Sequence, residues 1–351
     1  MKHLIIILLS FCCSLSWATD TITITLTGDI LLDRGVRKHI ESTDINHLFT
    51  PEIDSVFHSS DYVIGNLECP ATHIKSPAFK KFVFRAEPEW LQALQEHGFT
   101  HLNLANNHSV DQGRKGLVDT FHQIEKYGMI PIGAGENMQQ AAQPILIDNS
   151  IRPIYIIASQ RLPLENFAYL PDQFSISQEP WDSLLNRVKT LRQAQPTSYI
   201  IVTLHWGWEH QTTPTITQRQ EAHQLIDAGA NALVCHHTHT LQTIEEYRGC
   251  PIYYSIGNFI FDQNKPINTR ACIVKLHISA KEARAETIPI NIISHVPRVI
   301  EVRKLEARCK MQENSHIGNC ELNLHEKWFF YGEIHLKGVV FSNIMFIFAM
   351  S

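Results

Sequence analysis

Residues 231–240 read NALVCHHTHT, an apolar run that ends in three histidines within four positions. An imidazole is a good ligand for a borderline metal ion and fits poorly into an apolar core. His237 and His239 are alternate residues, so they share a face if the segment stays extended, whereas His236 then points away from that face. The stretch therefore predicts a strand that brings histidines to a metal site.

Polar side chains end the other predicted strands in the same way. Four apolar runs, TITITLTG (residues 21–28), DYVIG (61–65), THLNLA (100–105) and SYIIVTL (198–204), are each followed by carboxylate, amide or imidazole groups. In an open parallel sheet the carboxyl ends of the strands meet at one edge, where ligands bind. We therefore expect one site formed by Asp29, Asn66, Glu68, Asn106, Asn107, His108, His205, His237 and His239.

The rest of the chain alternates strands with amphipathic helices, which is typical of an α/β fold with a largely parallel sheet system. Residues 144–149 and 152–159 predict a hairpin-like pair, as do 240–247 and 251–261, and more β structure follows up to residue 294. No linker divides residues 22–300, so we expect one domain there. The predicted helices cover residues 87–99, 113–128, 180–193 and 215–230.

Composition alone decides little. The chain has 351 residues, a formal net charge of −5 and no basic excess, so nothing indicates a nucleic-acid partner. Lys2 precedes an apolar run from Leu4 to Trp17, and Ala18 offers a small residue for cleavage. Residues 1–18 therefore predict a signal peptide, with an uncleaved anchor as the alternative. We expect an exported protein, periplasmic or extracellular, and membrane-associated if the segment is retained.

The last part of the chain, residues 301–351, breaks the pattern and reads as a C-terminal extension of unclear role. It contains Cys309 and Cys320, which are the most plausible disulfide pair in an exported protein. Cys69 and Cys272 are better explained as buried small apolar residues.

The predicted site mixes carboxylate and amide oxygens with imidazole nitrogens. Such a donor set suits a pair of divalent transition metal ions (Mn, Fe or Zn) better than Mg or Ca, which prefer oxygen ligands. The chain contains no C-x-x-C motif, so a structural zinc site built on cysteines is a poor match.

Several long blocks in this order resemble the CapA family of bacterial capsule-biosynthesis proteins, which is associated with poly-γ-glutamate and is similar to calcineurin-like metallophosphoesterases. The blocks include GDILLDR (28–34), NLECP (66–70), GFTHLNLANNHSVDQGRKGL (98–117), HWGWEH (205–210) and AGANALVCHHTHTLQTIEEYRGCPIYYSIGNFIFDQ (228–263). The resemblance implies a four-layer α-β-β-α sandwich of metallophosphoesterase type, with a dinuclear metal site on one edge.

The resemblance also implies roles for single residues. Asp29 would bind the first metal, Glu68 or Asn66 would take the bridging or neighbouring place, and Asn107 would bind the second metal. His205, His237 and His239 would complete the two shells, and His108 would stabilise charge or act as a general acid. Outer or substrate contacts would come from Arg34 and Glu209, and Asn258 would shape the same edge.

The sequence departs from the usual phosphoesterase pattern at three positions. The histidine expected two residues after the first aspartate is Leu31, an expected aspartate is Asn66, and the glycine ahead of the histidines is Cys235. One metal is thereby left with fewer or different ligands, and we expect Cys235 to pack rather than bind metal.

Three functions remain open. The chain could be a metal-dependent hydrolase of a phosphoester or an anionic polymer, an accessory subunit that binds poly-γ-glutamate without turnover, or a structural metalloprotein. Capsule-synthesis membrane proteins are the partners that the resemblance implies.

Overall fold

The computed structural model describes residues 20–170 and 172–300, together with the backbone of two strands near the C-terminus. The chain divides into two compact units, Met1–Val299 and Ile300–Ser351. In the second unit, β17 (Phe329–Leu336) and β18 (Val339–Ile347) form an antiparallel hairpin. The predicted signal peptide and the predicted Cys309–Cys320 pair lie outside the described residues.

The first sheet of the larger unit has eight strands. Five of them, including the two that end at Asp29–Ile30 and Asn66–Leu67, run parallel, and the remaining three form an antiparallel meander. Its strands, in spatial order, are β16 (Val296–Val299), β15 (Ala283–Ile293), β14 (Arg270–Ser279), β1 (Thr21–Ile30), β2 (Tyr62–Leu67), β3 (His101–Asn103) and β4 (Ile130–Ile132), with β13 (Asn258–Ile260) also paired to β1.

The second sheet has six strands, of which the central four are parallel. The two predicted hairpin-like pairs are confirmed as its antiparallel margins. In spatial order the strands are β11 (Ile244–Tyr247), β12 (Cys250–Tyr253), β10 (Ala232–Val234), β9 (Tyr199–His205), β7 (Ile154–Gln160) and β6 (Ile145–Asp148), and a separate short pair joins β5 (Ala134–Gly135) to β8 (Ser175–Ile176).

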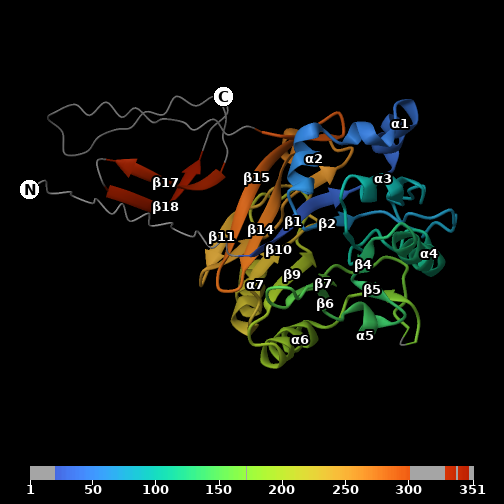
Figure 1. Cartoon of the computed structure of the whole chain (residues 1–351). Coiled ribbons are helices and arrows are strands. Elements are labelled where there is room, and N and C mark those ends of the chain that lie inside the picture. The colour runs from blue at the N-terminus through green and yellow to red at the C-terminus, as the bar shows by residue number, and fades with distance from the viewer. Residues whose placement is uncertain (1–19, 171, 301–328, 337–338, 348–351) are drawn as a thin grey trace, which may run out of the picture. The chain divides into compact units, whose positions relative to one another are not determined.

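Helices cover the outer face of each sheet (Figure 1). All four predicted helices are present, whereas the helices before residue 60 and the two four-residue helices at Met138–Ala141 and Pro266–Thr269 were not predicted. The helices are α1 (Arg34–Ser42), α2 (Pro51–His58), α3 (Trp90–Glu96), α4 (Gly113–Lys126), α5 (Met138–Ala141), α6 (Trp181–Ala194), α7 (Ile216–Ala228) and α8 (Pro266–Thr269), with the 3₁₀ helix η1 at Ile45–Leu48.

Three hydrophobic cores show that the layers stack as α-β-β-α. The alternation of β9 is the clearest sign, because Ile201 packs in the core between the sheets and Ile200 and Val202 pack beneath α6 and α7. On the other side, Val36 of α1 and Leu117 of α4 pack with the outer face of the first sheet. The four-layer sandwich expected from the sequence is confirmed.

The stretch 251–261, predicted as one strand, is two strands in different sheets. After β12 the chain turns at Gly257, whose φ is +78°, and β13 then pairs in parallel with β1. Gly28 of β1 lies so close to Gly257 that a Cβ atom would clash with its carbonyl oxygen. This close approach brings Asn258 beside Asp29.

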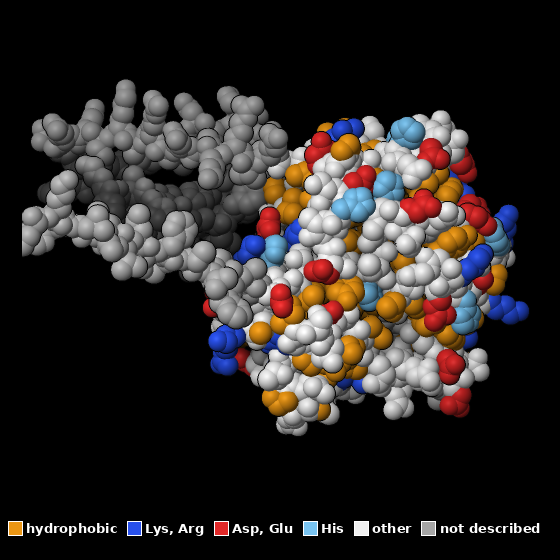
Figure 2. Space-filling model, viewed as in Figure 1, with side chains coloured by type: hydrophobic (Ala, Val, Ile, Leu, Met, Phe, Trp, Pro, Cys, Tyr) orange, Lys and Arg blue, Asp and Glu red, His pale blue; other side chains and the backbone are white. Residues whose placement is uncertain are grey.

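Within the described residues, no helix has the length and apolar character needed to cross a membrane. On the face shown in Figure 2, acidic and basic side chains are interspersed, so neither sign of charge dominates it.

Candidate metal centre

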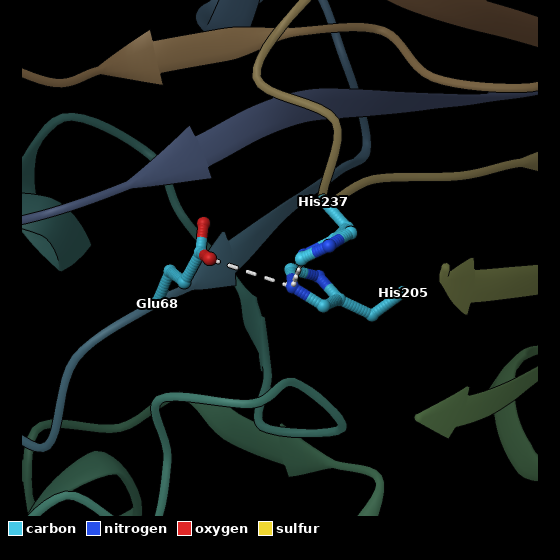
Figure 3. Close-up of side chains that lie close together, drawn as sticks. All are labelled: Glu68, His205 and His237. Carbon is cyan, nitrogen blue, oxygen red and sulfur yellow. Dashed lines mark hydrogen bonds and ion pairs between the residues drawn. The ribbon is translucent and has the colours of Figure 1, made fainter. Parts of the chain in front are cut away.

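One group of donor atoms lies where the ends of the two sheets face each other. Nε2 of His205 lies 2.8 Å from Oδ1 of Asn107, 3.2 Å from Nδ1 of His237 and 3.4 Å from Oε1 of Glu68. Glu68 and His205 reach toward each other from opposite sides (Figure 3). Ligand atoms about 2.0–2.3 Å from a common ion lie about 3–3.5 Å apart, so these four residues are spaced as the shell of one metal.

A second group adjoins the first and shares Glu68 with it. Asp29, Glu68 and His239 each offer a ligand atom within 4.8 Å of the other two. Nδ1 of His239 lies 3.2 Å from Oδ2 of Asp29, and its Nε2 lies 3.9 Å from Oε1 of Glu68. The sequence left the bridging place to Glu68 or Asn66, and the geometry favours Glu68.

Unsatisfied polar atoms indicate that these groups fit cations. Both carboxylate oxygens of Glu68 and Oδ2 of Asp29 are buried and accept no hydrogen bond from the described residues. Burial, followed by the neighbouring Asp29 carboxylate, raises the pKa of Glu68 well above its ordinary value. Three buried carboxylate oxygens without donors are costly, and a divalent ion between the two side chains would offset that cost.

The imidazoles are also suited to binding a metal. Burial lowers the pKa of His237 to about 3 and lowers that of His205 well below its ordinary value. Both side chains are therefore neutral at physiological pH, which is the form that binds a metal ion.

The histidines converge for a different reason than the sequence suggested. Strand β10 ends at Val234, before the first histidine. His237 and His239 adopt φ values of +93° and +55°, so they belong to a tight loop and not to an extended segment. Such left-handed conformations in residues other than glycine are uncommon and cluster at functional sites.

His236 does not point away from the site, contrary to the expectation for a continuing strand. Its Nδ1 lies 3.4 Å from Oδ1 of Asp29, and the residue is 3% exposed. His236 still pairs in parallel with His205, and it continues the alternation in which Val234 faces the core between the sheets and Cys235 the core beneath α6 and α7; the extended segment breaks only at His237.

Asn66 supports Asp29 and has no free group for a metal. Its Nδ2 donates to Oδ1 of Asp29 at 2.7 Å, and its Oδ1 accepts from Asn103 and Asn106 at 3.0 and 3.3 Å. Because both ends of the amide are engaged, Asn66 holds the carboxylate of Asp29 in place. Asn258 does the same for His239, whose Nδ1 lies 2.9 Å from its Oδ1.

His108 belongs to a buried network that the sequence did not predict. Its Nδ1 lies 2.8 Å from Oδ2 of Asp111, and its ring packs on that of Phe84 with the centroids 4.3 Å apart and the planes tilted by 33°. Lys80 forms an ion pair with Asp111 and donates to the carbonyl oxygen of Asn107 at 2.9 Å. The i, i+3 spacing of His108 and Asp111 could have indicated the contact with Asp111, but nothing local indicates Lys80.

Arg34 and Glu209 contact none of the donor atoms. The Arg34 guanidinium makes two contacts of 2.8 Å with Asp262 and lies 5.5 Å from the centre of the Phe84 ring. Glu209 is exposed, with its Oε2 3.7 Å from Nε2 of His210. Cys235 is fully buried in the core beneath α6 and α7, as expected of a packing residue.

A third group, His73, Glu87 and Glu89, also has donor atoms within 4.8 Å. It is largely exposed, and Glu87 is already paired with Arg85 and Arg37. This group lacks the buried, unsatisfied oxygens of the other two.

Comparison with known proteins places these features in one family. The model of the family described as bacterial capsule synthesis protein PGA_cap matches residues 23–263. The chain is 29% identical to the PGA biosynthesis protein CapA of Bacillus subtilis (strain 168) over 85% of this chain and 79% of that protein. It is 30% identical to the capsule biosynthesis protein CapA of Bacillus anthracis, over 80% and 70% of the two chains. A solved structure of a hypothetical protein from Thermus thermophilus superposes with a TM-score of 0.47 and 12% identity, over 76% of this chain and 99% of that one.

Proposed function

Because the chain belongs to the bacterial capsule synthesis protein family PGA_cap, we propose that it serves in capsule synthesis as a metal-dependent hydrolase. The observation that carries the proposal is the pair of donor groups joined by Glu68, whose two oxygens are buried and unsatisfied. Carboxylate, amide and imidazole donors together suit Mn, Fe or Zn.

In this proposal, Glu68 is shared between two metal positions. Asp29 and His239 complete the first position, and Asn107, His205 and His237 complete the second. Two divalent ions would supply Lewis-acid stabilisation of the charge that develops on a phosphoryl or related group, and they would lower the pKa of the attacking water.

His108 is the residue placed to move a proton. Its Nδ1 is held by Asp111, so the proton on that nitrogen is fixed and Nε2 is left for the substrate. Packing on Phe84 restricts the ring further. In this role the ring must carry a second proton, on Nε2, and it gives that proton to the leaving oxygen; the Asp111 carboxylate favours the protonated ring, and Asp111 and Lys80 keep it in position.

The substrate class in this proposal is a phosphoester or an anionic polymer such as poly-γ-glutamate. Arg34 is 41% exposed at its side chain, but Asp262 neutralises its charge. We therefore assign recognition of the anionic group chiefly to the metal positions, with Arg34 at the rim.

The test is to strip the purified protein of metal, refill it with Mn, Fe or Zn, and measure hydrolysis of bis(p-nitrophenyl) phosphate. We expect activity to return with at least one metal. His108→Asn should lower kcat by about 10²–10⁴-fold with metal content unchanged. If no metal restores activity on phosphodiester, phosphomonoester or polymer substrates, the proposed hydrolase function is excluded.

A second candidate is a metal-binding accessory subunit that binds the polymer without cleaving it. The inequality of the two positions favours it, because the first group has one histidine whereas the second has two. The test is binding of fluorescent poly-γ-glutamate to a protein that shows no hydrolysis. Loss of this binding in Glu68→Gln, together with loss of metal, would establish the accessory function.

We further propose that the protein is exported. The proposal rests on the apolar run from Leu4 to Trp17 after Lys2. Fractionation of cells that produce the full chain, with mass spectrometry of its N-terminus, tests both export and cleavage near Ala18. Retention in the cytoplasm with an intact N-terminus would refute it.

A further inference from the structure

The two metal positions differ in the number of histidines that serve them. His205, His237, Asn107 and Glu68 surround the second position with separations of 2.8–3.4 Å from Nε2 of His205. The group at the first position, Asp29, Glu68 and His239, contains one histidine, whereas the group at the second contains two. Position 31, two residues beyond Asp29, cannot supply a further ligand, because leucine has no donor atom. Leu31 is fully buried in the core beneath α1–α4.

His236 has an unpartnered nitrogen beside the first position. Its Nδ1 is buried and has no hydrogen-bond partner among the described residues. The closest carboxylate oxygen is Oδ1 of Asp29, at 3.4 Å. An imidazole nitrogen that is buried without a partner costs free energy, and a ligand bond would remove that cost.

The surrounding loop holds His236 at this place. The backbone N–H of His236 donates to the carbonyl of Leu204 at 2.9 Å, and its carbonyl accepts from the N–H of Trp206 at 3.3 Å. These bonds fix the His236 backbone to the end of β9, beside His205. The side chain is therefore held by the second sheet and directed at the end of β1.

We propose that His236 is a ligand of the first metal position, through Nδ1. The inference rests on the proposed function. With His236, which adjoins the group of Asp29, Glu68 and His239 through Asp29, the first position would have two imidazoles, as the second does. Two carboxylates and two imidazoles at one ion favour a transition metal over Mg or Ca. The alternative is that His236 donates a hydrogen bond to Asp29 without touching the metal.

The experiment measures bound metal by elemental analysis of the full chain after reconstitution with Co(II) and dialysis, together with the visible absorption of bound Co(II). We expect about two equivalents in the wild type and about one in His236→Phe and His236→Ala, with loss of part of the Co(II) spectrum. His237→Ala, which affects the second position, should remove a different part of the spectrum. His101→Phe is the matched control, since His101 is an equally buried histidine on β3 that belongs to no donor group.

The possible results distinguish the role of His236 from the proposed metal-dependent function. Two equivalents with an unchanged spectrum in both His236 variants would overturn the inference and leave the metal centre standing. A wild type that binds no metal would overturn both. Thermal unfolding of the metal-free proteins checks that the variants fold. A His236 variant whose metal-free Tm equals that of the wild type, and which binds only one equivalent of metal, supports the proposal.

Discussion

Oε1 of Glu68 lies 3.4 Å from Nε2 of His205, and no hydrogen bond from the described residues reaches either oxygen of this carboxylate. The carboxylate comes from the end of β2 in the first sheet, and the imidazole from the end of β9 in the second. One contact thus joins both halves of the sandwich at the proposed metal centre.

Glu68→Gln should lower the metal content at both positions, because Glu68 belongs to both donor groups. A ligand present at 100 times its Kd stabilises a protein by about 2.7 kcal/mol, so the variant should lose most of the metal-dependent rise in Tm. Elemental analysis and calorimetry with and without metal measure both effects. Glu89→Gln, in the exposed third group, is the control and should change neither. Full metal content in Glu68→Gln would refute a shared carboxylate.

Asn66→Ala should weaken metal binding without abolishing it. Asn66 donates to Oδ1 of Asp29 at 2.7 Å, and loss of such an orienting partner costs about 10–100-fold in metal affinity. Competition with a chelator gives the affinity. Asp29→Ala should lose the metal at the first position completely. If Asn66→Ala loses as much metal as Asp29→Ala, Asn66 is itself a ligand.

Asp111→Asn should lower both stability and kcat. Lys80 and Asp111 form a buried pair with side chains 6% and 0% exposed, and removing one partner of a buried pair costs about 3–5 kcal/mol. Unfolding in urea measures the loss. The double variant Asp111→Asn with Lys80→Met should recover part of the stability but not kcat, because His108 still lacks its partner. Recovery of both would mean that Asp111 does not position His108.

The stability should fall between about pH 6.5 and pH 4 in part because of His101. Burial lowers the pKa of His101 to about 4, so the folded state resists protonation while the unfolded chain binds a proton near pH 6.5. A depressed folded pKa means that this stability is present above pH 6.5 and is lost as the pH falls through 4. His101→Phe should flatten the pH dependence in urea titrations by an amount on the order of 2–3 kcal/mol. An unchanged slope would assign the acid sensitivity to other groups.

The sequence predicted the class of the fold and the strands that carry the site, because period-2 and helical patterns are local. It placed Asp29, Glu68, Asn107 and His205 at strand ends that do meet. It placed His236 away from the site only for a segment that stays extended, and it could not show that the chain leaves the extended conformation at His237.

Two further parts of the site could not be predicted from local patterns. Lys80 lies in a loop without regular structure, 31 positions from Asp111, and only tertiary packing brings the two together. The pairing of β13 with β1 was missed because an apolar run does not reveal that the chain passes between sheets at Gly257.

The origin of the donor atoms has a consequence for metal selectivity. The oxygen donors Asp29, Glu68 and Asn107 lie at or just beyond the ends of strands of the first sheet, and the imidazoles at or just beyond the ends of strands of the second. Neither half alone offers the mixed set, since an oxygen-only cluster would suit Mg or Ca. In the proposed centre, discrimination between hard and borderline ions would therefore depend on how the apolar interior, including Ile24 and Ile201, spaces the two sheets. Loss of a methyl group from this interior would be expected to change which ion the proposed centre prefers.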